Sequence, residues 1–216
     1  MRALLFDLDG TLADTDRLHE QAWLEVLLPY GIRGDHAFYQ QHISGHLNPE
    51  IVSRLLPHLP PLERTALIEV KERRFRELAQ GLKALPGLEG LWRWARERGL
   101  TLALVTNAPR PNAEHVLQAL GAEFDLVVLA EELAAGKPDP LPYRTALGRL
   151  GLDPAEALAF EDSPSGVRSA VGAGIRTIGL TTGHDPRGLL EAGAFLLIDD
   201  FSDGRLWEYL EGESDS

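Results

Sequence analysis

The sequence predicts an α/β fold, in which a doubly wound parallel sheet carries a small all-helical cap inserted after the first strand. Three observations predict it. Short apolar runs recur through the chain, and segments with helical periodicity separate them from the second run onward. Between the first and second runs lies a long stretch with helical segments and no convincing strand. Alternation of strand and helix patterns is typical of a parallel sheet with helices on both faces.

The apolar runs are predicted to be buried strands, because strands covered on both faces are continuously apolar rather than alternating. They cover residues 3–6, 101–105, 126–129, 157–160, 177–180 and 195–198. Apolar residues spaced three or four apart predict the helices that connect them. These cover residues 88–98, 111–120, 141–150 and 165–173.

The long interruption is predicted to be a cap domain, because it far exceeds what a single crossover between parallel strands needs. Residues 17–28 have apolar positions at helical spacing, and residues 62–78 are amphipathic and rich in charge. A turn signal at Leu85-Pro86-Gly87 marks the return to the core. We therefore expect residues 1–13 and 82–216 to form the α/β core and residues 14–81 to form the helical cap.

Composition excludes several classes of function. The formal net charge of -12 and the absence of a basic stripe argue against a nucleic-acid partner. No apolar run is long enough to span a bilayer, so we expect no membrane partner. The first apolar run reaches Asp7 too early for a signal peptide, which favours a cytoplasmic location. Without cysteine, thiolate metal sites and cysteine catalysis are impossible. A monomer is our expectation.

Polar residues follow four of the predicted strands, at the edge of the sheet where α/β proteins bind ligands. The four segments are Asp7-Leu8-Asp9-Gly10-Thr11, Thr106-Asn107, Gly136-Lys137-Pro138-Asp139 and Glu161-Asp162-Ser163. Clustered carboxylates repel one another and require a counter-charge, which Mg²⁺ supplies with oxygen ligands. A lysine and a hydroxyl beside that cation would form a pocket for an anion such as phosphate.

These segments resemble the motifs of the haloacid dehalogenase superfamily, in the expected order along nearly the whole chain. The resemblance implies a Rossmann-like core and Mg²⁺-dependent phosphoryl transfer in which Asp7 is the nucleophile and Asp9 the general acid and base. Members that cleave carbon–halogen or carbon–phosphorus bonds lack an acid where this chain has Asp9, so the resemblance implies phosphate esters.

The same resemblance implies the remaining members of the site. Asp162 and Glu161 would hold the metal together with Asp7 and the backbone carbonyl of Asp9. Thr106, Asn107 and Lys137 would bind the phosphoryl oxygens, with Thr106 and Lys137 counted among the catalytic residues.

The placement of the cap, together with Thr15 and His19, resembles the β-phosphoglucomutase-like and phosphoglycolate phosphatase-like subgroup. We therefore expect Thr15, His19 and Gly45 to bind a small phosphorylated substrate, such as a sugar phosphate or phosphoglycolate. The subgroup contains both phosphatases and mutases. In mutases an arginine closely follows the cap glycine, whereas the first arginine after Gly45 is Arg54. Hydrolysis is therefore favoured, with a β-phosphoglucomutase-type reaction as the alternative.

Simpler interpretations exist for most of these residues. The Asp-x-Asp-Gly-Thr segment alone is typical of turns and calcium-like loops, and Thr106 with Asn107 could cap the following helix. Lys137 could be a solvated surface residue and His19 an ordinary half-buried histidine. On the cap, Lys71, Arg73 or Arg74 could replace the missing arginine of the mutases.

Overall fold

The computed structural model of the protein describes residues 1–214. They divide into two compact units. One comprises Met1–Asp14 and the chain from Leu82 onward, and the other comprises Thr15–Gly81. The first unit contains every strand of the described chain, and the second is all helical. Within residues 1–214, no helix combines the length and the apolar character that crossing a membrane requires.

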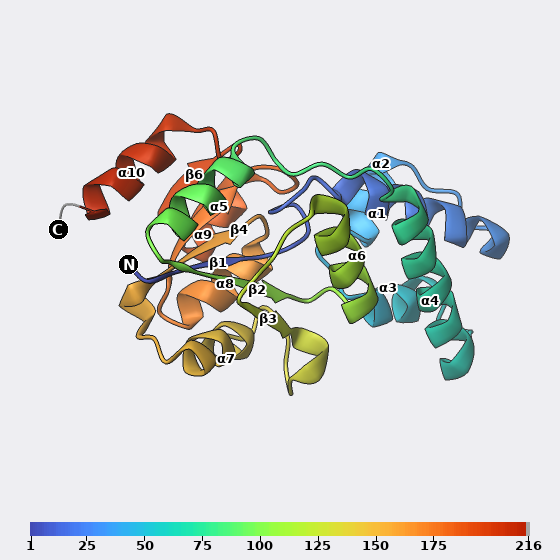
Figure 1. Ribbon diagram of the computed structural model, residues 1–216. Coiled ribbons are helices and arrows are strands. Elements are labelled where there is room, and N and C mark those ends of the chain that lie inside the picture. Colours follow the sequence, from blue (N-terminus) through green and yellow to red (C-terminus); the bar gives the residue numbers. More distant parts are fainter. Residues whose placement is uncertain (215–216) are drawn as a thin grey trace. The chain divides into compact units, whose positions relative to one another are not determined.

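The first unit is built on a six-stranded parallel sheet with the strand order β3-β2-β1-β4-β5-β6 (Figure 1). The strands are β1 (Ala3–Phe6), β2 (Thr101–Thr106), β3 (Leu126–Leu129), β4 (Ala157–Glu161), β5 (Arg176–Leu180) and β6 (Leu196–Ile198). This confirms the predicted fold class. β2 and β4 each extend one residue beyond the predicted run, so that Thr106 and Glu161 lie within strands rather than after them.

The two faces of the sheet follow from the alternation of side chains along each strand. Ala3 and Leu5 of β1 belong to a buried core with residues of α7 and α8. On the opposite face, the ring of Phe6 stacks on Phe160 with the centroids 5.0 Å apart, and both rings contact Phe201. Apolar cores on both faces bury β1 at the centre of the sheet.

All helices of this unit except the last lie between successive strands, and the last one follows β6 (Figure 1). They are α5 (Leu88–Glu97), α6 (Arg110–Leu120), α7 (Leu141–Leu150), α8 (Pro164–Gly172), α9 (Pro186–Ala192) and α10 (Gly204–Ser214), with 3-10 turns at Ala130–Glu132 and Pro154–Glu156. The side chain of Ser163 caps α8 by accepting a hydrogen bond from the amide of Gly166. Glycine in the left-handed conformation ends α6 and α7, at Gly121 and Gly151.

The second unit consists of four helices among its described residues. They are α1 (Asp16–Leu27), α2 (His36–His42), α3 (Asn48–Leu55) and α4 (Pro61–Leu78), and a 3-10 turn at Leu28–Tyr30 follows α1. Residues such as Trp23, Tyr39, Ile51 and Leu67 form its apolar core. α1 and α4 lie within one residue of their predicted bounds, whereas the short helices α2 and α3 were not predicted individually.

A charged group is buried in this helical unit. The side chain of Lys71 is 2% exposed and lies 3.1 Å from the carboxylate of Glu72, which is itself buried. Its ammonium also lies 2.8 Å from Nδ1 of His19, and an ammonium can act only as the donor in that bond. Asn48 donates a hydrogen bond to the same carboxylate oxygen of Glu72.

Candidate active site

The topology places one candidate site beside β1. From β1 the strand order runs to β2 and β3 on one side and to β4, β5 and β6 on the other. In open α/β sheets, ligands bind beyond the carboxyl ends of the strands at the point where the order reverses. Asp7 directly follows β1, and Asp162 directly follows the neighbouring strand β4, so both lie at this position.

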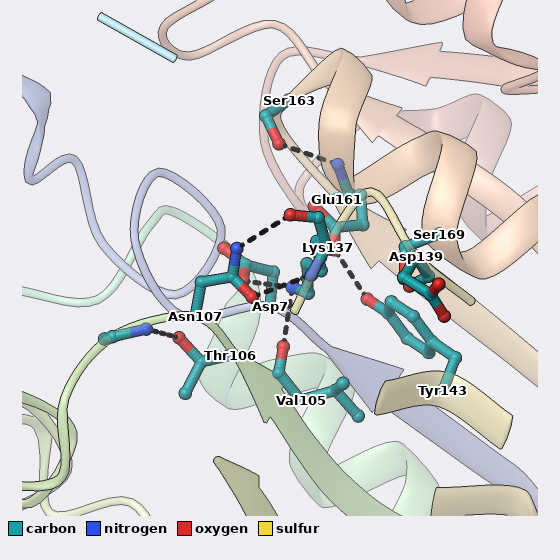
Figure 2. Close-up of polar contacts among 12 residues, drawn as sticks. Asp7, Val105, Thr106, Asn107, Lys137, Asp139, Tyr143, Glu161, Ser163 and Ser169 are labelled. Carbon is teal, nitrogen blue, oxygen red and sulfur yellow. Dashed lines mark hydrogen bonds and ion pairs between the residues drawn. The ribbon is translucent and has the colours of Figure 1, made fainter. Parts of the chain in front are cut away.

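Lys137 joins the residues of three strands at this edge. Its ammonium lies 2.5 Å from Oδ1 of Asp7 and 2.7 Å from Oε1 of Glu161, and it donates a hydrogen bond of 2.7 Å to the carbonyl of Val105 (Figure 2). These contacts account for all three protons of the ammonium. Lys137 is buried, which excludes the interpretation of a solvated surface lysine.

Burial and charge shift the pKa values of the whole cluster. Burial raises the pKa of Asp7 well above its ordinary value; Lys137 opposes this shift, and the other two carboxylates add to it. Burial likewise raises the pKa values of Glu161 and Asp162. For Lys137, burial alone would lower the pKa, but the charges of Asp7 and Glu161 raise it above the ordinary value. The cluster thus has more negative charge than its single lysine neutralises.

Two glycines, which have no side chain, make space for these carboxylates. A Cβ atom on Gly166, in the first turn of α8, would overlap the carboxylate of Glu161. A Cβ atom on Gly10 would overlap the carboxylate of Asp162, and Gly10 also has a φ of 72°. Glycine is therefore required at both positions for the acids to lie where they do.

Asp9 lies in the tight loop that follows Asp7. In this loop the amide of Gly10 donates to the carbonyl of Ala13, and the hydroxyl of Thr182 donates to the carbonyl of Gly10 at 2.6 Å. Asp9 is half-buried, and its charge is close enough to add to the raised pKa of Asp162, which burial dominates. The loop therefore places Asp9 beside the cluster of Asp7, Glu161 and Asp162.

Thr106 and Asn107 do not cap the next helix. The hydroxyl of Thr106 accepts a hydrogen bond from the amide of Ala108, and α6 has no side-chain cap. The side-chain amide of Asn107 bonds the backbone of Lys137 at both ends: Oδ1 accepts from its amide at 3.0 Å, and Nδ2 donates to its carbonyl at 3.2 Å. Asn107 thereby fixes the segment that carries Lys137 (Figure 2).

The three residues predicted to bind substrate from the cap lie in the helical unit. Thr15 is buried at the start of α1, and its side chain makes no capping bond there. The ring of His19 stacks on Phe75 with the centroids 4.0 Å apart and is bonded to Lys71. Gly45 is exposed between α2 and α3 with a φ of 75°. His19 therefore forms part of the polar cluster around Lys71.

The residues at the sheet edge fit a divalent cation. Asp7, Glu161 and Asp162 each offer a carboxylate oxygen, and these three oxygens lie within 4.8 Å of one another. Within residues 1–214, Oε2 of Glu161 and Oγ1 of Thr11 are buried without a hydrogen-bond partner. A buried polar oxygen without a partner is costly, and a hard cation with oxygen ligands relieves that cost.

Several neighbours of the cluster were not predicted from the sequence. The hydroxyl of Tyr143, on α7, donates to Oε1 of Glu161 at 2.7 Å. His184 lies 3.6 Å from Oδ2 of Asp162, in the same loop as Thr182. Thr182 and His184 closely follow residues 177–180, the fifth predicted strand, and this position is the signal in the sequence that points to them. Tyr143 lies within a helix, where a tyrosine is typical of core packing and gives no signal.

Comparison with known proteins gives a consistent match. The family model for haloacid dehalogenase-like hydrolases matches residues 1–174. The chain is 35% identical to protein CbbY of Cereibacter sphaeroides over 219 residues, covering 94% of each chain. It is 36% identical to the phosphorylated carbohydrates phosphatase of Thermotoga maritima over 207 residues, covering 92% of this chain and 94% of the relative.

A solved structure shares the same architecture. CbbY from Rhodobacter sphaeroides, crystallised as a mutant in complex with xylulose-(1,5)bisphosphate, superimposes with a TM-score of 0.82. The alignment covers 94% of this chain and 96% of that chain at 32% sequence identity.

Proposed function

Because the chain belongs to the haloacid dehalogenase-like hydrolases, we propose that its phosphatase reaction passes through a phosphoryl group carried covalently by Asp7. The chain is a phosphoric monoester hydrolase that acts on phosphorylated metabolites. The observation that supports Asp7 as the nucleophile is its place at the end of the central strand, paired with Lys137 and beside two further acids.

In the first step, a carboxylate oxygen of Asp7 attacks the phosphorus of the ester, and the bond between phosphorus and the ester oxygen breaks. Asp9, in its protonated form, gives its proton to the departing alkoxide, so that a neutral alcohol leaves. In the second step, Asp9 takes a proton from water as the water oxygen attacks the aspartyl phosphate. Inorganic phosphate leaves, and the carboxylate of Asp7 is restored.

Lys137 orients the nucleophile in this mechanism. All three of its protons are engaged with Asp7, Glu161 and the carbonyl of Val105, so a bond to a phosphoryl oxygen would replace one of these contacts. Its buried positive charge also stabilises the charge that the phosphoryl group brings to the site. Asn107 keeps the Lys137 backbone in place, and the Thr106 hydroxyl remains our candidate for a phosphoryl contact.

Asp7, Glu161 and Asp162, with the backbone carbonyl of Asp9, would hold the Mg²⁺ ion. When bound, Mg²⁺ would neutralise charge on the phosphoryl oxygens and between the carboxylates. Two observations support a cation at this place: Oε2 of Glu161 has no hydrogen-bond partner in the described part of the chain, and the pKa values of the three acids are raised.

We propose a phosphorylated sugar or sugar-like metabolite with one phosphate as the substrate, in keeping with the names of the relatives. A sugar bisphosphate, such as the ligand of the CbbY structure, is the second candidate. A second phosphate would need a cationic group of its own. In the helical unit, Lys71 is neutralised by Glu72, and Arg74 is paired with Glu25 and Glu77.

The test is hydrolysis of a panel of sugar phosphates, sugar alcohol phosphates, phosphoglycolate and sugar bisphosphates with Mg²⁺. Wild-type protein and Asp7→Asn are assayed side by side, since the amide cannot act as the anionic nucleophile. We expect the wild type alone to release phosphate and to retain labelled phosphate on Asp7 after an acid quench. Full turnover by a pure, folded Asp7→Asn variant would exclude the covalent mechanism.

A further inference from the structure

Tyr143 contacts the cluster of acids from the face of the sheet toward which Glu161 points. Successive side chains of a strand alternate between its faces, so Glu161 points to the same side of β4 as Ala157 and Ala159. Both alanines belong to the core cluster that also contains Tyr143. α7 packs on this face, and Tyr143 is fully buried in it, with its hydroxyl at the end of β4.

The hydroxyl of Tyr143 donates its hydrogen bond to a charged group of the candidate site. A buried tyrosine needs one hydrogen-bond partner, and a backbone carbonyl would suffice. Here the partner is a carboxylate oxygen, Oε1 of Glu161, which also contacts Lys137 at 2.7 Å (Figure 2). The Lys137 ammonium lies 5.3 Å from the centre of the Tyr143 ring. Tyr143 thus contacts both charged groups through different parts of its side chain.

The two donors act on one oxygen of Glu161 and leave the other available. Oε1 receives both Tyr143 and Lys137, while Oε2 has no hydrogen-bond partner among residues 1–214. Close packing against Gly166 fixes the carboxylate on the remaining side, because even a methyl group at that position would overlap it. The carboxylate is therefore held in one orientation by two donors and by contact with Gly166.

We propose that Tyr143 is a positioning residue of the metal site, whose hydroxyl holds Glu161 in the orientation that binds the divalent cation. This inference rests on the Mg²⁺ dependence proposed above. Groups that orient a metal ligand commonly contribute about 10-fold to 100-fold to metal affinity. The hydroxyl, rather than the ring, makes this contribution, because phenylalanine would fill the same space without donating a bond.

The test is Tyr143→Phe, with Mg²⁺ binding measured by calorimetry in the absence of substrate. We expect Mg²⁺ to bind about 10-fold or more weakly than to the wild type. In steady-state assays, the Mg²⁺ concentration for half-maximal activity should rise, while KM for the phosphate ester at saturating Mg²⁺ should stay near the wild-type value. Thermal unfolding of the variant without Mg²⁺ reports whether the fold is retained.

Tyr39→Phe is the matched control. Tyr39 is also buried, and its hydroxyl also donates to a carboxylate, Oδ1 of Asp16 at 2.8 Å, but it lies in the core of the helical unit. Loss of the Tyr39 hydroxyl should leave the Mg²⁺ affinity unchanged. A double-mutant cycle provides a second measurement: in a Glu161→Gln background, Tyr143→Phe should have little further effect on Mg²⁺ binding.

Equal Mg²⁺ affinities for the wild type and Tyr143→Phe would overturn the inference and leave the proposed function intact. Additive effects of Tyr143→Phe and Glu161→Gln would also overturn it, because they would show that the tyrosine does not act through Glu161. Full hydrolysis by a wild-type protein that binds no Mg²⁺ would instead refute the metal dependence itself.

Discussion

The ammonium of Lys137 lies 2.5 Å from Oδ1 of Asp7, although the two residues are 130 positions apart in the sequence. Asp7 follows the central strand, and Lys137 lies between β3 and α7, where Asn107 bonds its backbone. A buried carboxylate without such a partner would favour its protonated form, which cannot attack phosphorus. The pairing therefore favours the ionised form of Asp7, opposing the effect of burial on its pKa, and fixes the carboxylate in position.

Asp9→Asn should slow both halves of the reaction, because one carboxyl group gives a proton to the leaving alkoxide and later takes one from water. The expected loss of kcat is on the order of 10²-fold or more. Rapid-quench measurements should show slower formation and slower hydrolysis of the aspartyl phosphate. If the rates of both steps were unchanged, Asp9 would not be the general acid and base.

Removal of divalent cations should abolish activity. We expect protein treated with EDTA and then freed of it to be inactive, and added Mg²⁺ to restore the original rate, because three buried carboxylates share one lysine. Mg²⁺ should also raise the midpoint of thermal unfolding, since a ligand that binds the folded state stabilises it. Full activity in metal-free protein would exclude the cation from the mechanism.

Gly166→Ala should lower activity by displacing Glu161, whose carboxylate occupies the space that the new methyl group would need. Overpacking of this kind costs about 1–3 kcal/mol of stability. The matched control is Gly148→Ala in α7, where an added Cβ meets no atom within 4 Å. That variant should retain full activity and gain about 0.4–1 kcal/mol from the reduced freedom of the unfolded chain.

The pair of variants distinguishes the site from a general effect of replacing helical glycines. Activity and unfolding by urea are measured for both. If Gly166→Ala keeps wild-type turnover and Mg²⁺ affinity, the position of Glu161 does not matter for the reaction.

The strands could be predicted because each is a continuous apolar run, and the long helices because their apolar residues recur at helical spacing. Their ends were less accurate: β2 and β4 include Thr106 and Glu161, whose polar side chains had marked the end of the apolar run. The short helices α2 and α3 depend on tertiary packing around residues such as Tyr39 and Ile51, which local periodicity does not reveal.

The members of the site could be listed from the sequence, since polar residues after parallel strands gather at one edge. The hydrogen bonds among these residues could not be predicted. Nothing local indicates that Asn107 holds the backbone of Lys137 or that Tyr143 reaches Glu161. The burial of Lys71 was equally unexpected, because lysine is rarely buried without a partner, and its partners Glu72 and His19 become evident only in the fold.

The protein should hydrolyse β-glucose 1-phosphate or another phosphomonoester rather than isomerise it. A mutase must hold a bisphosphate intermediate by both phosphates, and the distal phosphate needs a cationic group, ideally a bidentate arginine. No arginine closely follows Gly45, and the first one, Arg54, donates to the carbonyl of His42. Among the possible substitutes, Lys71 is neutralised by Glu72 and Arg74 by Glu25, which leaves Arg73, an exposed residue of α4.

The experiment supplies β-glucose 1-phosphate, Mg²⁺ and catalytic glucose 1,6-bisphosphate, and follows free phosphate and glucose 6-phosphate together. We expect phosphate release from at least one phosphomonoester to exceed glucose 6-phosphate formation, because water is then the only acceptor of the phosphoryl group on Asp7. Rapid glucose 6-phosphate formation with little free phosphate would contradict this prediction. In that event, Arg73→Ala should abolish isomerisation if Arg73 binds the distal phosphate. The control is Arg93→Ala in α5, the same substitution in the other unit, which should not affect isomerisation.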